Sequence, residues 1–456
     1  MARRAQARLV ALAAAGVIAV AVPGASAQTA AGHQPTAQPP PTQQPPTQQP
    51  PTQRPTSQQP PAQQAAPQQP LAPPPATLTL NEAFTRALDA NRTIAASRLA
   101  RPIDVAGVSA AGQRPNPEVN VEFDHPETPH WAFMGSIPID ISNKRQRRID
   151  VANATLAVTD AETARVAADV RANVRRAYYQ VVAASRRVDI TQELETIATR
   201  ARDAAQERFQ AGAAPRLEAL QAGLALAQAQ NETNAARGEL TASRVELNAL
   251  LAFPPNAAPA LSDPLEGGTL PTETSVTQQT LASNAELQVL QKEIDEARSR
   301  VSLAQAMRRP DPTVSGSVTY DSPPDFTWGW RAAGTIALPI FTTGKPEVAM
   351  AQATLNRAIA DHDARAAQIT GDVAAAFARA AAARQTFDRY QNEILPESLQ
   401  VESMAEESYR SGQTGLPAYL QAVQTARDIR QRALQAGLDY QLALADLERA
   451  MGTPLR

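Results

Sequence analysis

The feature that most constrains the fold is a helix-to-strand signal that occurs twice. The segment RPNPEVNVEFD at 114–124 ends an Ala-rich helical pattern with two prolines and then alternates apolar and polar residues. The segment RRPDPTVSGSVTYD at 308–321 repeats this signal much later in the chain. Proline ends a helix because it lacks a backbone N–H, and alternation with period two is typical of a strand. The sequence therefore predicts two copies of one transition.

Matching residues on both sides of this signal extend the repeat. The segments RFQAG and YRSG end at Gly212 and Gly412, and Ala152 and Leu156 match Ala351 and Leu355. Self-similarity at a nearly constant offset indicates a duplicated structural unit. We expect one copy at 77–253, a linker at 254–271 and a second copy at 272–456.

Each copy predicts a helix, two strands, a long helix, a turn and a final helix. The first copy is expected to hold helix 81–112, strands 117–124 and 131–141, and long helix 143–211. The second copy is expected to hold helix 276–308, strands 312–321 and 329–341, and long helix 344–411. Apolar residues of the first long helix recur at steps of three and four, which is typical of a coiled-coil seam.

The N-terminal region indicates export. Positive charges, an apolar run and the small residues Ala25-Ser26-Ala27 predict a signal peptide at 1–27, although a membrane anchor is an alternative. The following Pro/Gln-rich residues, 28–76, are expected to form a disordered linker. The chain has no Cys, which excludes disulfides and a lipid-modified N-terminal Cys. Its net charge of −2 gives no sign of a nucleic-acid partner.

The alternating strands indicate how the chain contacts a membrane. No segment after the signal peptide has the ~18 consecutive apolar residues of a membrane helix. One strand face is apolar, and Trp131, Trp328 and Trp330 near the strand ends are typical of an aromatic girdle. A soluble sheet with one wet face shows the same alternation. We favour a β-barrel with Glu122 and Asp140 facing its lumen.

Four strands are too few to close a barrel, for which about eight are needed. Because an open sheet edge is not tolerated in lipid, the chain is expected to form an oligomer. Two copies would give eight strands with a filled interior, and three would give twelve with room for a passage.

The sequence resembles the family of TolC-type outer-membrane efflux channels, and more narrowly its CzcC-like cation-efflux branch. The resemblance covers about 77–453. It is carried by RPNPEVNVEFD at 114–124, NKRQRRIDVANATL at 143–156, VRRAYYQVVAASRRVDI at 174–190 and ERFQAGAAPRLEALQAGLALAQAQ at 207–230. The missing N-terminal Cys and the long Pro/Gln linker are departures from many relatives.

This resemblance implies a mainly α fold with a small β part. Long antiparallel helical hairpins would form a periplasmic α-barrel, and four strands per protomer would contribute to a twelve-stranded outer-membrane β-barrel of a homotrimer. It also implies a periplasmic adaptor, or membrane fusion protein, and an inner-membrane efflux pump of RND type as partners.

The helical turns farthest from the strands are the candidate adaptor contacts, because in the family these tips meet the adaptor. Small or uncharged residues between the helices permit close approach of another protein. The candidate tip residues are Gly212, Ala213, Ala214, Pro215, Gly412, Gln413, Thr414 and Gly415.

The periplasmic mouth departs from the family pattern. The prototype closes it with acidic side chains, and the matching positions here are Ala418 and Gln421. A ring formed by Glu218, beside Gln421, is the candidate replacement.

No catalytic or cofactor-binding constellation is visible, so we expect neither an enzyme nor a cofactor. His125, Glu127 and His130 form a candidate metal-contact cluster in a predicted loop, with an ordinary polar loop as the alternative. The predicted function is a passive outer-membrane exit duct of a tripartite system for heavy-metal cations. A duct for drugs or other small molecules, and a structural or adhesion-type periplasmic coiled coil, are the alternatives.

Overall fold

The two predicted copies are both visible in the computed structural model, which describes residues 75–124, 130–266, 268, 270–321 and 327–455. The elements of the first copy are α1 (Leu80–Ala90), α2 (Arg92–Arg98), α3 (Ala100–Ala111), β2 (Glu118–Asp124), β3 (His130–Pro138), α4 (Lys144–Gln210) and α5 (Arg216–Leu251). The elements of the second copy are α6 (Glu273–Ser283), α7 (Ala285–Met307), β5 (Thr313–Asp321), β6 (Thr327–Thr335), α8 (Lys345–Arg389), the π-helical turn η1 (Tyr390–Ile394), α9 (Leu395–Arg410) and α10 (Leu416–Met451).

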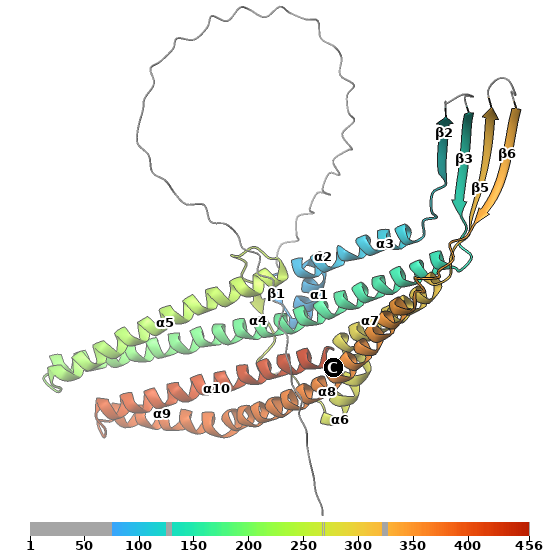
Figure 1. The fold of residues 1–456 in the computed structure, drawn as a ribbon. Coiled ribbons are helices and arrows are strands. Elements are labelled where there is room, and N and C mark those ends of the chain that lie inside the picture. Colours follow the sequence, from blue (N-terminus) through green and yellow to red (C-terminus); the bar gives the residue numbers. More distant parts are fainter. Residues whose placement is uncertain (1–74, 125–129, 267, 269, 322–326, 456) are drawn as a thin grey trace, which may run out of the picture. The chain divides into compact units, whose positions relative to one another are not determined.

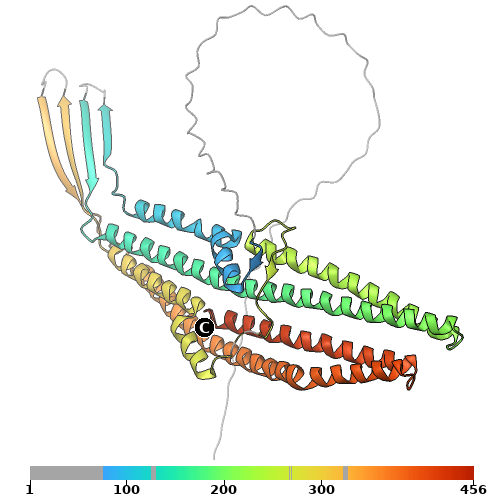
Figure 2. The ribbon, with the colours of Figure 1, turned by 180° about the vertical axis from the view of Figure 1, so that it is seen from behind.

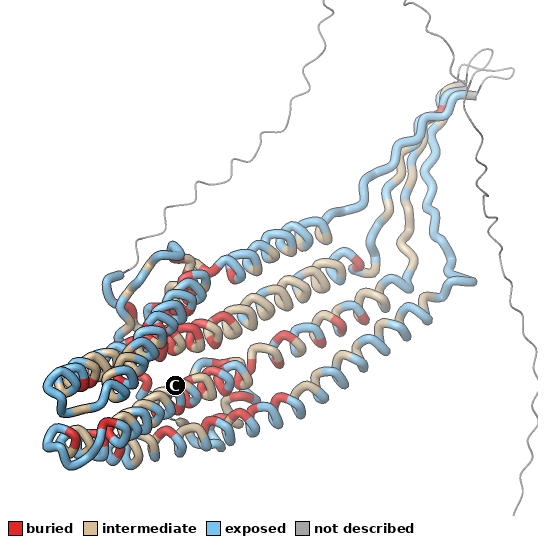
Figure 3. Tube along the Cα trace, turned by 90° about the vertical axis from the view of Figure 1, so that its left-hand side faces the viewer, coloured by how far each residue is buried: buried red, intermediate tan, exposed pale blue. Residues whose placement is uncertain are grey.

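The long helices form two antiparallel hairpins. α4 pairs with α5, and α8 and α9 pair with α10, as opposite views show (Figures 1 and 2). The largest apolar cluster includes Val174, Tyr178 and Val181 of α4 with Leu247 and Leu251 of α5. Figure 3 shows that buried residues follow the helices, whereas the strands are mainly exposed. The helices therefore supply the core within one chain.

The first helix of each copy is interrupted at a buried asparagine, where the sequence predicts one continuous helix. Asn91 caps α2 through its side-chain oxygen and donates from Nδ2 to the Leu250 carbonyl at 2.8 Å. Asn284 caps α7 and donates to the Met451 carbonyl at 2.9 Å. A side-chain cap satisfies backbone donors at a helix start, so a break at these positions is stabilised. The prediction of unbroken helices at 81–112 and 276–308 is therefore wrong.

Two further interruptions follow from proline. Pro102 has no N–H for the carbonyl of Arg98, next to the break between α2 and α3 at Leu99. Pro396 has none for the carbonyl of Asn392, within the turn η1 that separates α8 from α9. A π turn accommodates such a missing donor by widening the helix locally.

The four long strands form one antiparallel sheet in the order β2-β3-β5-β6. The hairpin of the first copy thus lies beside the hairpin of the second, and β2 and β6 are the edges (Figure 1). A separate parallel pair, β1 (Thr77–Leu78) with β4 (Ala260–Leu261), ties the inter-repeat linker to the start of the first copy. The hydroxyl of Tyr178 on α4 lies 2.8 Å from Asp263, directly after this pair.

A buried ion-pair cluster joins the two copies. Glu448 of α10 accepts from Arg171 at 2.6 Å and from Arg175 at 2.7 Å, both on α4. The Glu448 side chain is 2% exposed, and the Arg171 guanidinium lies 3.8 Å from the ring centre of Phe84. Removing one partner of a buried ion pair leaves an uncompensated charge, which is strongly destabilising.

Within the described part of the chain, no helix carries a stretch both long and apolar enough to span a bilayer.

Replacing Glu448 with Ala should lower the free energy of unfolding by about 3–5 kcal/mol, because the buried Arg175 and the partly buried Arg171 lose their counter-charge. Denaturant unfolding of the full chain in detergent measures this effect. The matched control is Asp446→Ala, two residues earlier on α10, which removes the exposed partner of Arg176. That change should cost about 1 kcal/mol or less. Equal effects of the two substitutions would show that the buried cluster does not join the copies.

Candidate functional site: the strand sheet, a helical pocket and the hairpin tips

One face of the sheet is apolar across all four strands, as the alternation predicts. The strand register brings Val121, Phe133, Val318 and Trp330 into one row. Within one chain these side chains are largely solvent-exposed, and Trp330 reaches 83%. An exposed apolar face of this extent marks a surface that contacts lipid or another chain.

The loop end of this face carries an aromatic row. Phe123, Trp131, Tyr320 and Trp328 lie opposite one another on successive strands. The ring centres of Phe123 and Trp131 are 4.4 Å apart, and those of Tyr320 and Trp328 are 4.9 Å apart. Trp330 lies two residues further from the loop on β6. The sequence identified the three tryptophans but missed the two residues that complete the row.

The opposite face of the sheet is richer in polar residues. Glu122 lies on it, opposite Ala132 of β3, with Asn120 two residues away on the same face. Ser315 and Ser317 of β5 continue this face. Glu122 therefore occupies the side of the sheet that the sequence assigns to a lumen.

Asp140 is not a strand residue, in contrast to the prediction for 131–141. β3 ends at Pro138, and the Asp140 carboxylate accepts backbone N–H groups of Ser142, Lys144 and Arg145 at 2.7–3.1 Å. Burial raises its pKa, but these three donors outweigh burial, and the net effect lowers the pKa of Asp140. The residue caps the start of α4 and so fixes the turn between sheet and helix.

Both predicted second strands are too long for a common reason. Thr313 begins β5 and pairs with Pro138 of β3 and Thr335 of β6. The residue before it, Pro312, has no N–H to continue either ladder, although its carbonyl accepts from Ile139 at 2.8 Å. Ile336 therefore lies just beyond β6 and not within a strand.

The hairpin tips have the same backbone geometry in both copies. Gly212 and Gly412 adopt φ values of 68° and 75°, which favour glycine, and each ends a long helix as predicted. The N–H of Ala213 donates to the Arg208 carbonyl, and the N–H of Gln413 donates to the Ser408 carbonyl. This bond pattern closes the helix and leaves the side chain of Ala213 exposed. Thr414 is also exposed.

Glu218 connects the two tips within one chain. Its carboxylate accepts from the Tyr409 hydroxyl at 3.3 Å and lies 3.9 Å from Arg208 Nε, with 14% of the side chain exposed. Burial, and then the Glu218 charge, raise the pKa of Tyr409, so its hydroxyl stays protonated and donates. Gln421 is exposed on the first turns of α10. A ring of Glu218 carboxylates needs several copies and stays a prediction.

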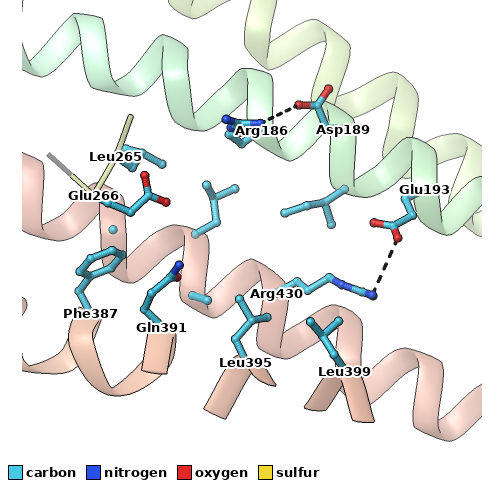
Figure 4. Close-up of a pocket in the computed structure, with 14 residues that line it drawn as sticks. Arg186, Asp189, Glu193, Leu265, Glu266, Phe387, Gln391, Leu395, Leu399 and Arg430 are labelled. Atoms are coloured by element: carbon cyan, nitrogen blue, oxygen red, sulfur yellow. Dashed lines mark ion pairs between the residues drawn. The ribbon is translucent and has the colours of Figure 1, made fainter. Parts of the chain in front are cut away.

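A pocket of about 380 Å³ lies between α4 and the second hairpin (Figure 4). Apolar side chains such as Leu265, Phe387 and Leu395 line it together with charged groups. Arg430 lies 4.0 Å from Glu193 and 2.7 Å from Glu402. Sequence reasoning missed this pocket because its residues come from distant segments, including the unexpected π turn.

The candidate metal cluster lies largely outside the described residues. His125 and Glu127 fall within 125–129, and the side chain of His130 is not described either. Among the residues that the structure does describe, no group of three or more His, Cys, Asp or Glu side chains is arranged to hold a metal ion.

Comparison with known proteins identifies the fold. Solved structures with the same fold include CusC, with a TM-score of 0.68, 15% identity and coverage of 82% of this chain and 92% of that one. The open-state MtrE outer membrane channel of Neisseria gonorrhoeae has a TM-score of 0.68, 18% identity and coverage of 82% and 89%.

Sequence comparison adds a relative and a family. The cobalt-zinc-cadmium resistance protein CzcC of Cupriavidus metallidurans is 26% identical over 382 residues, covering 82% of this chain and 90% of CzcC. The model of the family described as outer membrane efflux protein matches residues 132–252 and 276–453, which is more than half of the chain. The chain therefore belongs to the outer membrane efflux protein family.

Proposed function

We propose that three copies of this chain form the outer-membrane exit duct of a tripartite efflux system for heavy-metal cations. The observation that carries the proposal is the four-stranded sheet with one apolar face and two edges, β2 and β6. Membership of the outer membrane efflux protein family supports the export role. On this proposal the duct is passive, and the chain catalyses no reaction.

The trimer follows from the sheet edges. In lipid every backbone N–H and C=O needs a partner, so β2 of one copy must pair with β6 of the next. Two copies would give eight strands, which side chains fill, whereas three give twelve strands and a water-filled passage. The polar face, including Glu122, then lines the lumen, and the apolar face with Trp131, Trp328 and Trp330 contacts lipid.

The cation substrate rests on similarity to CzcC. That protein is described as a cobalt-zinc-cadmium resistance protein, and it matches this chain over most of both lengths. A duct does not need its own metal site, because selection can take place in an inner-membrane pump of RND type. A duct for drugs or other small molecules is the alternative that the same fold permits.

The tips are the proposed contact with a periplasmic adaptor. Both tips end in small, exposed residues. The two hairpins contact each other near the tips through the Tyr409 hydroxyl of α9 and the Glu218 carboxylate of α5, which lie 3.3 Å apart. A rigid pair of tips with small side chains allows another helical hairpin to approach closely. Export through the signal peptide at 1–27, followed by insertion without Cys lipidation, completes the proposed route to the outer membrane.

The mass of the purified protein in detergent should correspond to three copies, and the protein should conduct ions in planar bilayers. Both results follow from closure of a twelve-stranded barrel. Mass measurement by light scattering with correction for detergent checks the first, and single-channel recording checks the second. A stable monomer without conductance would contradict the duct.

The double substitution Ala213→Trp with Thr414→Trp should abolish adaptor capture and lower resistance to cobalt, zinc and cadmium in cells with the complete system. Bulky indoles would hold the partner away from both tips. The backbone bonds that close the tips do not involve these side chains, so oligomer mass should be unchanged. Cross-linking to the adaptor and a growth assay measure the effect.

The control for the tips keeps the side chains small. Ala213→Ser with Thr414→Ser should leave capture and resistance at the levels of the unmodified protein. Full capture by the tryptophan variant would mean that the tips are turns and do not contact the adaptor.

A further inference from the structure

Positive charge collects where the sheet meets the helices. The four connecting segments, 112–118, 138–150, 307–313 and 335–347, contain eight Lys or Arg residues and five Asp or Glu residues, whereas the whole chain has a net charge of −2. This excess lies immediately beyond the apolar face of the sheet. Neither the proposed lumen nor the proposed adaptor contact at the tips requires this excess of positive charge.

A pocket of about 470 Å³ lies at this boundary. It is lined by Arg114, Arg145 and Arg148 and also by Ile137 and Ile139. Ile137 lies on the apolar face of the sheet, opposite Val314 of β5. The pocket therefore opens between the proposed lipid-facing surface and a group of guanidinium ions.

Two of the three arginines are held in place by neutral partners. Arg145 Nε donates to the Gly112 carbonyl, and Arg148 donates to the Gln113 carbonyl at 3.3 Å, both next to the end of α3. Arg114 is exposed, and no carboxylate lies within ion-pair distance of it among the described residues. Since carbonyls do not neutralise a guanidinium, these three charges remain available to an anion.

The acidic groups of the same pocket are already engaged. Asp140 accepts three backbone N–H groups at the start of α4. Asp311 pairs with Lys144 at 2.9 Å, and the Lys144 side chain is 11% exposed. The pocket thus combines four cationic and two acidic side chains with an apolar wall.

We propose that this pocket binds the phosphate of an anionic glycerophospholipid whose acyl chains lie against the apolar face beyond Ile137. The inference rests on the proposed function, because it needs that face to contact lipid. Guanidinium groups bind phosphate oxygens through two parallel hydrogen bonds, and their planar donors suit a tetrahedral anion at the pocket mouth.

The spacing along β3 agrees with a lipid headgroup at this level. Trp131 in the aromatic row and Ile137 at the pocket are six residues apart, which is about 20 Å along an antiparallel strand. The apolar band of an outer-membrane barrel is about 25 Å tall. With the aromatic row at one interface, the arginine pocket lies near the other, at the periplasmic ends of the strands.

Native mass spectrometry of the full-length protein, titrated with phosphatidylglycerol in detergent, tests the inference. Arg114→Gln should weaken binding about fivefold, and Arg114→Gln with Arg148→Gln on the order of thirtyfold, because each removed charge contributes a similar attraction. Arg114 makes no ion pair or hydrogen bond in the described structure, so its loss does not disturb folding.

The matched control is Arg147→Gln. Arg147 precedes Arg148 on α4 but lies outside the pocket and pairs with Asp150 at 3.4 Å. Its replacement should leave phosphatidylglycerol binding within about twofold of the unmodified protein, since a partly paired surface charge contributes little.

Three results would overturn the inference. They are unchanged lipid binding by the double variant, equal loss in Arg147→Gln, and full displacement of phosphatidylglycerol by inorganic phosphate, which would indicate a site for free anions. Conductance of the same samples in planar bilayers separates this inference from the duct. A conducting double variant with unchanged lipid binding would refute the pocket alone, whereas an unmodified protein without conductance would refute the duct.

Discussion

Backbone hydrogen bonding in lipid is the constraint on which the proposed assembly depends. The chain supplies four paired strands and leaves β2 and β6 as edges. Water can satisfy such edges, but hydrocarbon cannot, so the sheet must continue into another copy wherever its apolar face contacts lipid. The long helices satisfy their backbone hydrogen bonds within each helix. Their apolar side chains pack within each hairpin.

The contacts that hold the helices together occur in both copies and between them. Each copy has a buried asparagine, Asn91 or Asn284, that ends one helix, caps the next and holds the end of the hairpin's last helix. The Glu448 cluster then joins α10 of the second copy to α4 of the first. These contacts set the relative positions of the hairpins, and the hairpins in turn present two tips with the same closing geometry. At the other end, Asp140 fixes the turn from which α4 leaves the sheet.

Much of this fold could be predicted from local sequence signals. Proline pairs, alternation and glycine turns located the strand starts, the long helices and both tips within about two residues, whereas the second strand of each copy was predicted too long. Some errors came from interactions that join distant segments, and others from local contacts that the apolar pattern does not show. In the sequence, Asn91 has no feature that marks it as a helix break, because its bond to the Leu250 carbonyl depends on the packing of α5. Asp140 fits the alternating pattern of a strand, but in the structure its carboxylate accepts N–H groups at the start of α4. The candidate sites were likewise predicted only in part. Glu218 was identified from its position in the sequence, but its contact with Tyr409 is visible only in three dimensions.

The central claim, that the apolar face of the sheet contacts lipid, can be measured without altering the chain. Its three tryptophans, Trp131, Trp328 and Trp330, all lie on that face. The full chain should be reconstituted in vesicles of brominated or ordinary phospholipid, and its fluorescence compared with and without aqueous iodide. If this face contacts lipid, brominated lipid should quench the fluorescence strongly and iodide should quench it little. Strong quenching by iodide with no effect of brominated lipid would contradict the central claim.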